Sequence, residues 1–375
     1  MFSPKKKYIS LFICHLFFFV SFSNEGKCIR EIKRKFSVQY ATHFKVKYLQ
    51  NGCKLVIDGA GRKLLLIHST DKVTIKNVLI DEIIKIPVRR VITRWSTIPS
   101  FLRSLEVGDT IVGVVTRKEE PCSEYLKSRL TSRNIEIVGG PGSLDYEKLV
   151  VLSPDIFFVS KWQSKKISKK LNQLNIPYAV ISEYLEDNPL GRAEWIKFFA
   201  SFYDKEEVAG NFFSGVVKRV KEISSRFKNK KLKPKVLWCI VRQDKTIYAP
   251  LGDSYVARMI SMAGGEYVVK ELKKINNAPI SWERFYLWGK EADIFISAVP
   301  LPQYGISSIK KLVALHPMLR DFKSIKKQNV WYLHSLYWES ADKIDGIIED
   351  LAAVFYPVLF PNHKFKYFFK LSDIQ

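Results

Sequence analysis

Two segments of the chain repeat one pattern, in which a glutamate opens a helix-like run and an aspartate precedes an apolar strand. Residues 146–159 are YEKLVVLSPDIFFV and residues 282–296 are WERFYLWGKEADIFI, so Glu147 and Glu283 occupy matching places. A carboxylate in the first turn of a helix interacts favourably with the helix dipole, and capping alone would account for both residues. Two equivalent exposed carboxylates also suggest a second interpretation, a pair of docking points for a single partner.

The motifs of common catalytic centres are absent from the sequence. The chain has no Gly-x-Ser-x-Gly elbow, no Walker loop and no HExxH helix, although Ser, His and Asp are all present. Its six His and five Cys follow no zinc-ligand spacing. We therefore expect a binding protein without a resident cofactor or metal. A chelatase-like metal-inserting enzyme and an adhesive envelope protein are the alternatives.

The first 23 residues have the features of an export signal. Lysines at positions 5–7 form a basic head, residues 9–22 form an apolar run, and Ser21-Phe22-Ser23 offers small residues where a signal peptidase reads them. About fourteen apolar residues are too few to span comfortably the roughly 30 Å of a bilayer core, so we predict cleavage after Ser23. An uncleaved membrane anchor is the alternative. Lipidation is disfavoured because no small residue immediately precedes Cys14 or Cys28.

The composition is that of a folded and strongly basic protein. Of its 375 residues, 47% are hydrophobic and 13% aromatic, so the chain can bury a core that offsets its ordering entropy. The formal charge is +24, and it is +21 once residues 1–23, with three lysines and no acid, are removed. Many lysines lie in helix-like segments such as 161–170 and 228–235. We therefore expect a solvated basic surface that is attracted to anionic lipid, and no nucleic-acid interface.

The alternation of apolar strands with helices along the sequence indicates two α/β units. Residues 37–68 predict a small β-meander, and from residue 88 short apolar strands alternate with helices, as in a parallel sheet covered on both faces. Residues 189–228 have helical spacing without a strand, and Trp195 lies on their apolar stripe. The predicted strands are 44–48, 54–57, 90–93, 111–115, 155–159, 178–181, 236–240, 293–297 and 330–333, and the predicted helices are 99–105, 164–174, 255–263, 282–291 and 345–355.

Several sequence motifs, in the order in which they occur along the chain, resemble those of the substrate-binding proteins of bacterial ABC importers for iron-siderophore, haem and cobalamin. The resemblance covers roughly residues 88–360. The phrases that carry it are RVIT at 90–93, LEVGDTIVGV at 105–114, the Glu147 segment ending LSPD, LNIP at 174–177 and SWE at 281–283. PLGRAEWIK at 189–197 and GDSYVARM at 252–259 are similar to one subgroup, which also carries an N-terminal β extension.

The resemblance implies an α/β fold of two Rossmann-like lobes, joined by one long rigid helix that begins near Pro189. The implied boundaries are a signal peptide at 1–23, a β extension at 24–87, an N-terminal lobe at 88–187, a helical connector at 188–228 and a C-terminal lobe at 229–375. Glu147 and Glu283 match the two family positions that pair with permease arginines, and charge-assisted pairs of this kind fix orientation. The expected partners of this exported monomer are an ABC permease with its cytoplasmic ATPase, in the periplasm or at the outer face of the cytoplasmic membrane.

The resemblance also places a ligand between the lobes, against loops at the ends of strands. An iron chelate, either a siderophore or haem, is the expected ligand, and a corrinoid is the alternative. Flat chelates need stacking aromatic rings, and anionic groups need arginine or lysine. Tyr304 or Tyr337 could ligate haem iron. The candidate ligand contacts are Arg94, Trp95, Trp162, Tyr184, Trp238, Tyr248, Tyr255, Arg258, Tyr304, His334, Tyr337 and Trp338.

The export signal generates the first testable prediction. The mature protein should begin at Asn24, because the peptidase cleaves behind the Ser-Phe-Ser site. N-terminal sequencing of the protein isolated from the cell envelope measures this directly. Recovery of an intact Met1 would contradict the prediction.

Overall fold

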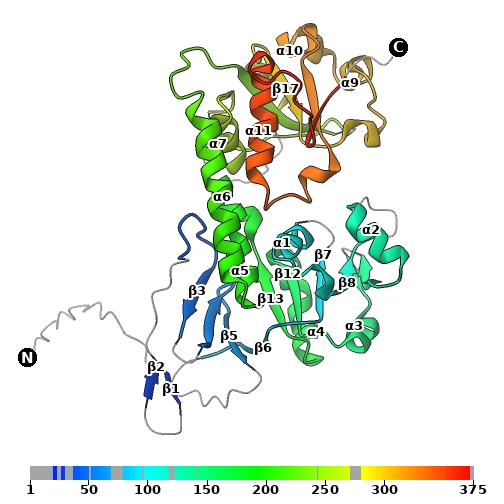
Figure 1. The fold of residues 1–375 in the computed structure, drawn as a ribbon. Helices are drawn as coiled ribbons and strands as arrows, with labels where there is room; N and C mark the ends of the chain where they lie inside the picture. The colour runs from blue at the N-terminus through cyan, green and yellow to red at the C-terminus, as the bar shows by residue number, and fades with distance from the viewer. Residues whose placement is uncertain are drawn as a thin grey trace, which may run out of the picture.

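The computed structural model describes residues 20–22, 27–29, 37–49, 52–68, 79–94, 97–117, 123–140, 142–242, 244–270 and 280–371. Within these residues, an N-terminal sheet and two α/β lobes are arranged around a pair of central helices (Figure 1). Strands β1 (Val20–Phe22) and β2 (Lys27–Ile29) form a separate antiparallel pair. The remaining residues of the predicted export signal lie outside the described part of the chain.

The sheet of the N-terminal lobe is parallel and has the strand order β13-β12-β7-β8-β9. Its strands are apolar along nearly their whole length because helices cover both faces. The strands are β7 (Val91–Arg94), β8 (Ile111–Val115), β9 (Glu136–Ile137), β12 (Ile156–Ser160) and β13 (Tyr178–Ile181), with a short hairpin of β10 (Gly139–Gly140) and β11 (Ser143–Leu144). The helices are α1 (Ile98–Ser104), η2 (Gly108–Thr110), α2 (Glu124–Thr131), α3 (Tyr146–Leu152), α4 (Lys161–Gln173) and η3 (Glu183–Leu185).

The sheet of the C-terminal lobe has the order β15-β14-β17-β18-β19, and β16 also pairs with β14. Strands β14, β17 and β18 are parallel, whereas β15 and β19 pair antiparallel at the edges. The strands are β14 (Lys235–Val241), β15 (Ile247–Tyr248), β16 (Glu266–Tyr267), β17 (Ile294–Ser297), β18 (Val330–Leu333) and β19 (Phe368–Lys370). The helices are α7 (Tyr255–Met262), α8 (Trp282–Gly289), η4 (Leu301–Tyr304), α9 (Ile309–Leu315), η5 (Pro317–Asp321), α10 (Lys323–Lys326), η6 (Ser335–Tyr337), α11 (Ile344–Phe355) and η7 (Pro357–Leu359).

Two antiparallel helices form the connector, and the longer of them spans the two lobes. Helix α5 (Pro189–Ser201) begins at Asn188, whose side chain accepts a hydrogen bond from Leu190 N at 2.9 Å, and all 13 of its residues are buried. The chain then turns at Asp204, which has a φ of 56°. Helix α6 (Glu206–Ser225) runs back beside α5 and extends into the C-terminal lobe (Figure 1). The long helix is therefore α6, and the helix that begins at Pro189 is the shorter, buried one.

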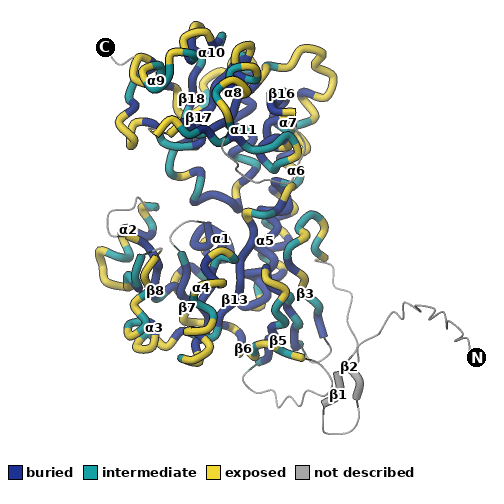
Figure 2. The backbone as a smooth tube through the Cα atoms, turned by 180° about the vertical axis from the view of Figure 1, so that it is seen from behind, coloured by how far each residue is buried: buried dark blue, intermediate teal, exposed yellow. Residues whose placement is uncertain are grey.

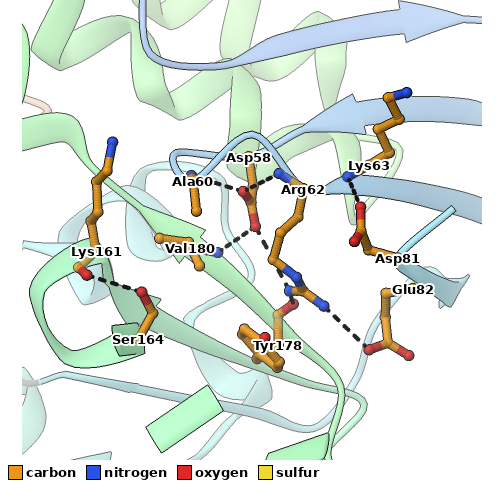
Figure 3. Close-up of polar contacts among 10 residues, drawn as sticks. All are labelled: Asp58, Ala60, Arg62, Lys63, Asp81, Glu82, Lys161, Ser164, Tyr178 and Val180. Atoms are coloured by element: carbon orange, nitrogen blue, oxygen red, sulfur yellow. Dashed lines mark hydrogen bonds and ion pairs between the residues drawn. The ribbon is translucent and has the colours of Figure 1, made fainter. Parts of the chain in front are cut away.

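The N-terminal extension is a four-stranded sheet that closes the edge of the first lobe. Strands β3 (Lys45–Tyr48), β4 (Lys54–Ile57) and β5 (Lys63–His68) form the predicted meander, and β6 (Glu82–Ile86) adds a parallel strand. Asp58 accepts a hydrogen bond from Val180 N at 2.9 Å, and the Arg62 guanidinium lies 3.7 Å from the ring centroid of Tyr178 (Figure 3). These contacts cover the outer edge of β13, which would otherwise expose unpaired backbone groups.

A second attachment holds residues 37–43 on α5. The Glu194 carboxylate accepts hydrogen bonds from the backbone N–H groups of residues 39–41 at 2.6–3.0 Å, and Lys197 Nζ lies 2.6 Å from it. Glu186 accepts hydrogen bonds from the N–H groups of Thr42 and His43 and, at 3.0 Å, from Trp195 Nε1. Figure 2 shows how completely α5 is buried at the centre of the molecule.

The predicted secondary structure is confirmed closely. Every predicted strand is present with bounds within one residue, and the predicted helices have bounds within three residues. Trp195 is fully buried, as its position on the apolar stripe predicts. None of the helices in the described part of the chain has the length and apolar character needed to cross a membrane.

Candidate functional site

A cleft of about 560 Å³ lies between the two lobes. Its walls come from the segment after β13, from α5, and from residues that end or follow β14, β15, β17 and β18. This is the crevice outside the carboxyl ends of parallel strands, where α/β proteins bind ligands. A second hollow of about 830 Å³ adjoins it, because Ile240 and Tyr248 line both. Their combined size suits a small-molecule ligand.

Six of the predicted ligand contacts line these two hollows. Tyr184 lies on the N-terminal lobe, and the others lie on the C-terminal lobe. The lining of the cleft is thus rich in aromatic side chains with polar tips, which suits a flat, partly polar molecule. The cleft is lined by Tyr184, Trp238, Tyr248, Tyr255 and Trp338, and the adjoining hollow by Tyr248 and Tyr304.

Tyr337 lies behind this lining and is not part of it. Its side chain is buried, its hydroxyl lies 3.2 Å from that of Tyr255, and its ring centroid is 5.9 Å from that of Trp238. Burial raises the pKa of Tyr337 well above its ordinary value, so the hydroxyl stays protonated. The structure therefore places Tyr337 as a support for Tyr255 and Trp238, behind the residues that line the cleft.

Two predicted residues gather on the N-terminal side near Tyr184, outside the lining. The backbone N–H of Trp162 hydrogen-bonds to the Tyr184 hydroxyl, and Arg94 lies near enough to favour the Tyr184 phenolate electrostatically. Burial nevertheless raises the pKa of Tyr184 overall. The indole of Trp162 is exposed and lies 4.8 Å below Lys166 Nζ. Arg94 and Trp162 thus lie beside the cleft, next to its lining residue Tyr184.

The remaining predicted contacts do not line either hollow. Arg258 is exposed on α7. His334 caps η6, since its Nδ1 accepts a hydrogen bond from Leu336 N at 3.3 Å, and burial lowers the pKa of its imidazole. Trp95 lies outside the described residues. The strand ends that the sequence singled out do border the cleft, but the sequence could not indicate which side chains turn towards it.

Arg192 is a cleft residue that the sequence patterns did not single out. It is buried in α5, lines the cleft, and its guanidinium lies 5.2 Å from the ring centroid of Tyr255. Burial opposes its charge, but the contact with the Tyr255 side chain and the nearby Glu183 carboxylate outweigh this, so the pKa of Arg192 is raised and the side chain stays cationic. Its Nε has no hydrogen-bond partner within the described residues. The available signal was an arginine in a helical segment that is otherwise largely apolar.

Glu183 supplies the nearby negative charge. This carboxylate is buried, and it accepts a hydrogen bond from Thr97 Oγ1 at 2.8 Å. Because Glu183 and Thr97 belong to the N-terminal lobe and Tyr255 to the C-terminal lobe, the charged group at Arg192 links both walls of the cleft. A buried cation with an unpaired N–H group can receive an anionic or carbonyl oxygen of a ligand.

The two glutamate segments occupy equivalent places in the two lobes. Helices α3 and α8 carry Glu147 and Glu283 in their first turns, both exposed, and lead to strands β12 and β17. The aspartate before each of these strands accepts a hydrogen bond from the backbone at the start of the neighbouring strand. Asp155 accepts a hydrogen bond from Arg90 N, and Asp293 accepts one from Lys235 N, both at 2.9 Å. The backbone N–H of Glu283 and the Ser281 hydroxyl lower the pKa of the Glu283 carboxyl, which is therefore ionised.

The comparisons with known proteins agree with this two-lobed arrangement. The family model described as periplasmic binding protein matches residues 96–337. An uncharacterized lipoprotein of Methanocaldococcus jannaschii is 30% identical over 369 residues, which cover 94% of this chain and 87% of that protein. The chain belongs to the periplasmic binding protein family.

Solved structures share the fold of this binding protein at low sequence identity. The periplasmic haem binding protein HutB of Vibrio cholerae is 16% identical, with a TM-score of 0.58, and the match covers 73% of this chain and 100% of HutB. The TroA-like periplasmic binding protein FepB of Veillonella parvula is 19% identical, with a TM-score of 0.57, and the match covers 85% of this chain and 99% of FepB. Such likeness establishes the two-lobed α/β fold.

The binding protein has a further contact between its lobes, at a hollow of about 340 Å³. Ser104 Oγ of α1 donates a hydrogen bond to Asp342 Oδ2 at 2.6 Å. Glu339 is buried and accepts hydrogen bonds from the hydroxyl and backbone N–H of Ser123 at the start of α2. Burial raises the pKa of Glu339 to about 7, although these hydrogen bonds oppose the shift. Among the described residues, no group of three or more His, Cys, Asp or Glu is arranged to hold a metal ion.

This carboxyl group generates a prediction about pH. The pKa of Glu339 is raised from 4.5 to about 7 in the folded protein, so folding favours its protonated form. The stability that this preference contributes is complete below about pH 4.5 and is lost as the pH rises through about 7. Glu339→Gln, which keeps a neutral side chain, should make thermal stability less dependent on pH between 5 and 8 and raise the melting temperature at pH 8.

Thermal unfolding followed by circular dichroism measures this effect. Glu207→Gln, which changes an exposed glutamate of α6, is the matched control and should leave the pH profile unchanged. If Glu339→Gln and the unaltered protein lose stability equally between pH 5 and pH 8, Glu339 does not titrate in this range.

Proposed function

We propose that this protein is the extracytoplasmic solute-binding component of an ABC importer, and that its cleft captures an iron chelate, either a siderophore or haem, for delivery to the permease. The observation that carries this proposal is the aromatic cleft between the lobes, with the buried Arg192 cation in its wall. Its geometry suits a flat chelate with anionic or carbonyl oxygens, since rings can stack on the chelate while the guanidinium binds an oxygen.

The comparisons support the same class of ligand and partner. HutB is named as a haem binding protein, and another structure of the same fold, from Staphylococcus epidermidis, is described as a possible iron-binding, periplasmic solute-binding protein. A third, from Listeria monocytogenes, is an ABC transporter substrate-binding protein. Two relatives from Methanocaldococcus jannaschii are lipoproteins, which supports a location outside the cytoplasm.

The connector supports binding with a small movement of the lobes. Helices α5 and α6 pack against each other, and both contact α7 and α11 of the C-terminal lobe, so the lobes are linked by packed helices and not by extended strands. Closure around a ligand should therefore be a limited shear or rotation. Capture and release without chemical change of the ligand is the activity we assign.

Docking on the permease is the role we propose for Glu147 and Glu283. They are exposed, lie one on each lobe, and occupy equivalent first turns, so together they can define the orientation of the protein on its partner. A carboxylate that pairs with an arginine at an interface gains strength as water is excluded. Neither residue lines the cleft, so docking and ligand binding use different side chains.

The ligand proposal predicts quenching of tryptophan fluorescence. Trp238 and Trp338 line the cleft, so titration with haem or with a ferric trihydroxamate siderophore at micromolar concentration should quench their emission. Tyr248→Ala should weaken binding about tenfold, because stacking on an aromatic ring and its buried area are lost. Tyr286→Ala, a half-buried tyrosine of α8 outside both hollows, is the control and should bind normally.

Three results would change this assignment. Quenching by cyanocobalamin alone would make the ligand a corrinoid. The absence of any response to the three compounds would contradict the proposed ligand class. Equal binding by Tyr248→Ala and the unaltered protein would remove the cleft as the binding site.

The docking proposal predicts a loss of transport with retained ligand binding. The double variant Glu147→Ala with Glu283→Ala should fold normally and keep its ligand affinity, whereas uptake through the cognate permease in proteoliposomes should fall steeply. Truncating one partner of a desolvated charge pair at an interface costs about 2–5 kcal/mol. Glu207→Ala with Glu291→Ala, at two other exposed glutamates, should transport normally. Loss of ligand binding with unchanged permease coupling would reverse the assigned role.

A further inference from the structure

Two apolar side chains protrude from the helices that carry Glu147 and Glu283. Val151 is 82% exposed on α3, and Leu287 is 77% exposed on α8. Among the large hydrophobic residues on the α-helices of the described chain, these two alone are more than three-quarters exposed. Single exposed leucines and valines are ordinary, but one on each lobe at the same structural position is a pattern.

The position of each apolar residue relative to its glutamate is the same. Val151 follows Glu147 by four residues, and Leu287 follows Glu283 by four residues, so each pair shares one face of its helix. Leu149 and Phe285, two residues after each glutamate, are fully buried and fix which face of the helix points outward. Each helix therefore presents a carboxylate and, one turn further on, an uncovered apolar side chain.

The occupant of this surface follows from its charge. A second copy of the chain would bring the same carboxylates against each other. An anionic lipid surface attracts the overall positive charge of the protein but offers no cation to these two carboxylates. A partner with two separate sites, each a cation beside an apolar depression, is complementary to both helices. If the protein has the function proposed above, this partner is the permease.

We propose that Val151 and Leu287 are the apolar half of the docking surface and insert into depressions on the permease beside the cations that receive Glu147 and Glu283. This inference rests on the proposed function and extends it. Burying a valine or leucine side chain at an interface removes apolar area from water, while the neighbouring glutamate fixes the orientation of the contact. Valine and leucine differ in length, so the two sites on the permease need not be of equal depth.

The test compares two double variants that remove the same kind of exposed side chain. Val151→Ser with Leu287→Ser should weaken binding to the cognate permease in nanodiscs about tenfold or more, measured by biolayer interferometry. Val358→Ser with Leu232→Ser is the matched control, because these residues are 90% and 89% exposed and lie outside α3 and α8. The control should bind within about twofold of the unaltered protein. Ligand quenching should be unchanged in both variants.

The outcomes separate this inference from the proposed function. If Val151→Ser with Leu287→Ser binds normally while Glu147→Ala with Glu283→Ala does not, the apolar contact is refuted and the docking role of the glutamates stands. If neither variant affects binding, both docking assignments fail. A third outcome would also overturn the inference. If Val151→Ser with Leu287→Ser keeps permease binding but loses self-association in sedimentation velocity, or loses binding to phosphatidylglycerol vesicles, these side chains belong to a different interaction surface.

Discussion

The arrangement of this protein depends on the burial of α5 and on how its charges are satisfied. The helix lies among the extension, α1, α6, α7 and α11, and none of its residues is exposed. A buried carboxylate without partners would be strongly destabilising. Glu194 avoids this because three backbone N–H groups and Lys197 surround it. The backbone at residues 39–41 therefore completes the hydrogen bonding of the connector.

The same helix positions the cation of the cleft. Because α5 is held on all sides, Arg192 has little freedom, and a group that is fixed before the ligand arrives loses less entropy on binding. Tyr337 acts in the same way from the other lobe, where it supports Tyr255 and Trp238. The cleft is thus built on rigid elements, while the contacts of Ser104 with Asp342 and of Glu339 with Ser123 hold its lobes together.

The proposed ligand cleft and the proposed docking surface are formed by different segments that connect to the same two sheets. The cleft is formed by the segments after β13, β14, β17 and β18, whereas α3 and α8 lead into β12 and β17. A change in the angle between the lobes would move Glu147 and Glu283 relative to each other. The distance between α3 and α8 would then differ between the open and the closed cleft, and a partner that contacts both helices could distinguish the two states.

The sequence by itself determined the central strands of both lobes, most of the helices, the burial of Trp195 and the equivalence of the two glutamate segments, because hydrophobic periodicity and capping are local properties. Only the tertiary structure decided that Trp338 lines the cleft while its neighbour Tyr337 supports it, that Arg192 is a cleft residue, and that Glu194 binds the backbone of Gln39, 155 residues away. Local patterns report that a face is buried. They do not report which distant segment covers it, since that depends on how the chain packs as a whole.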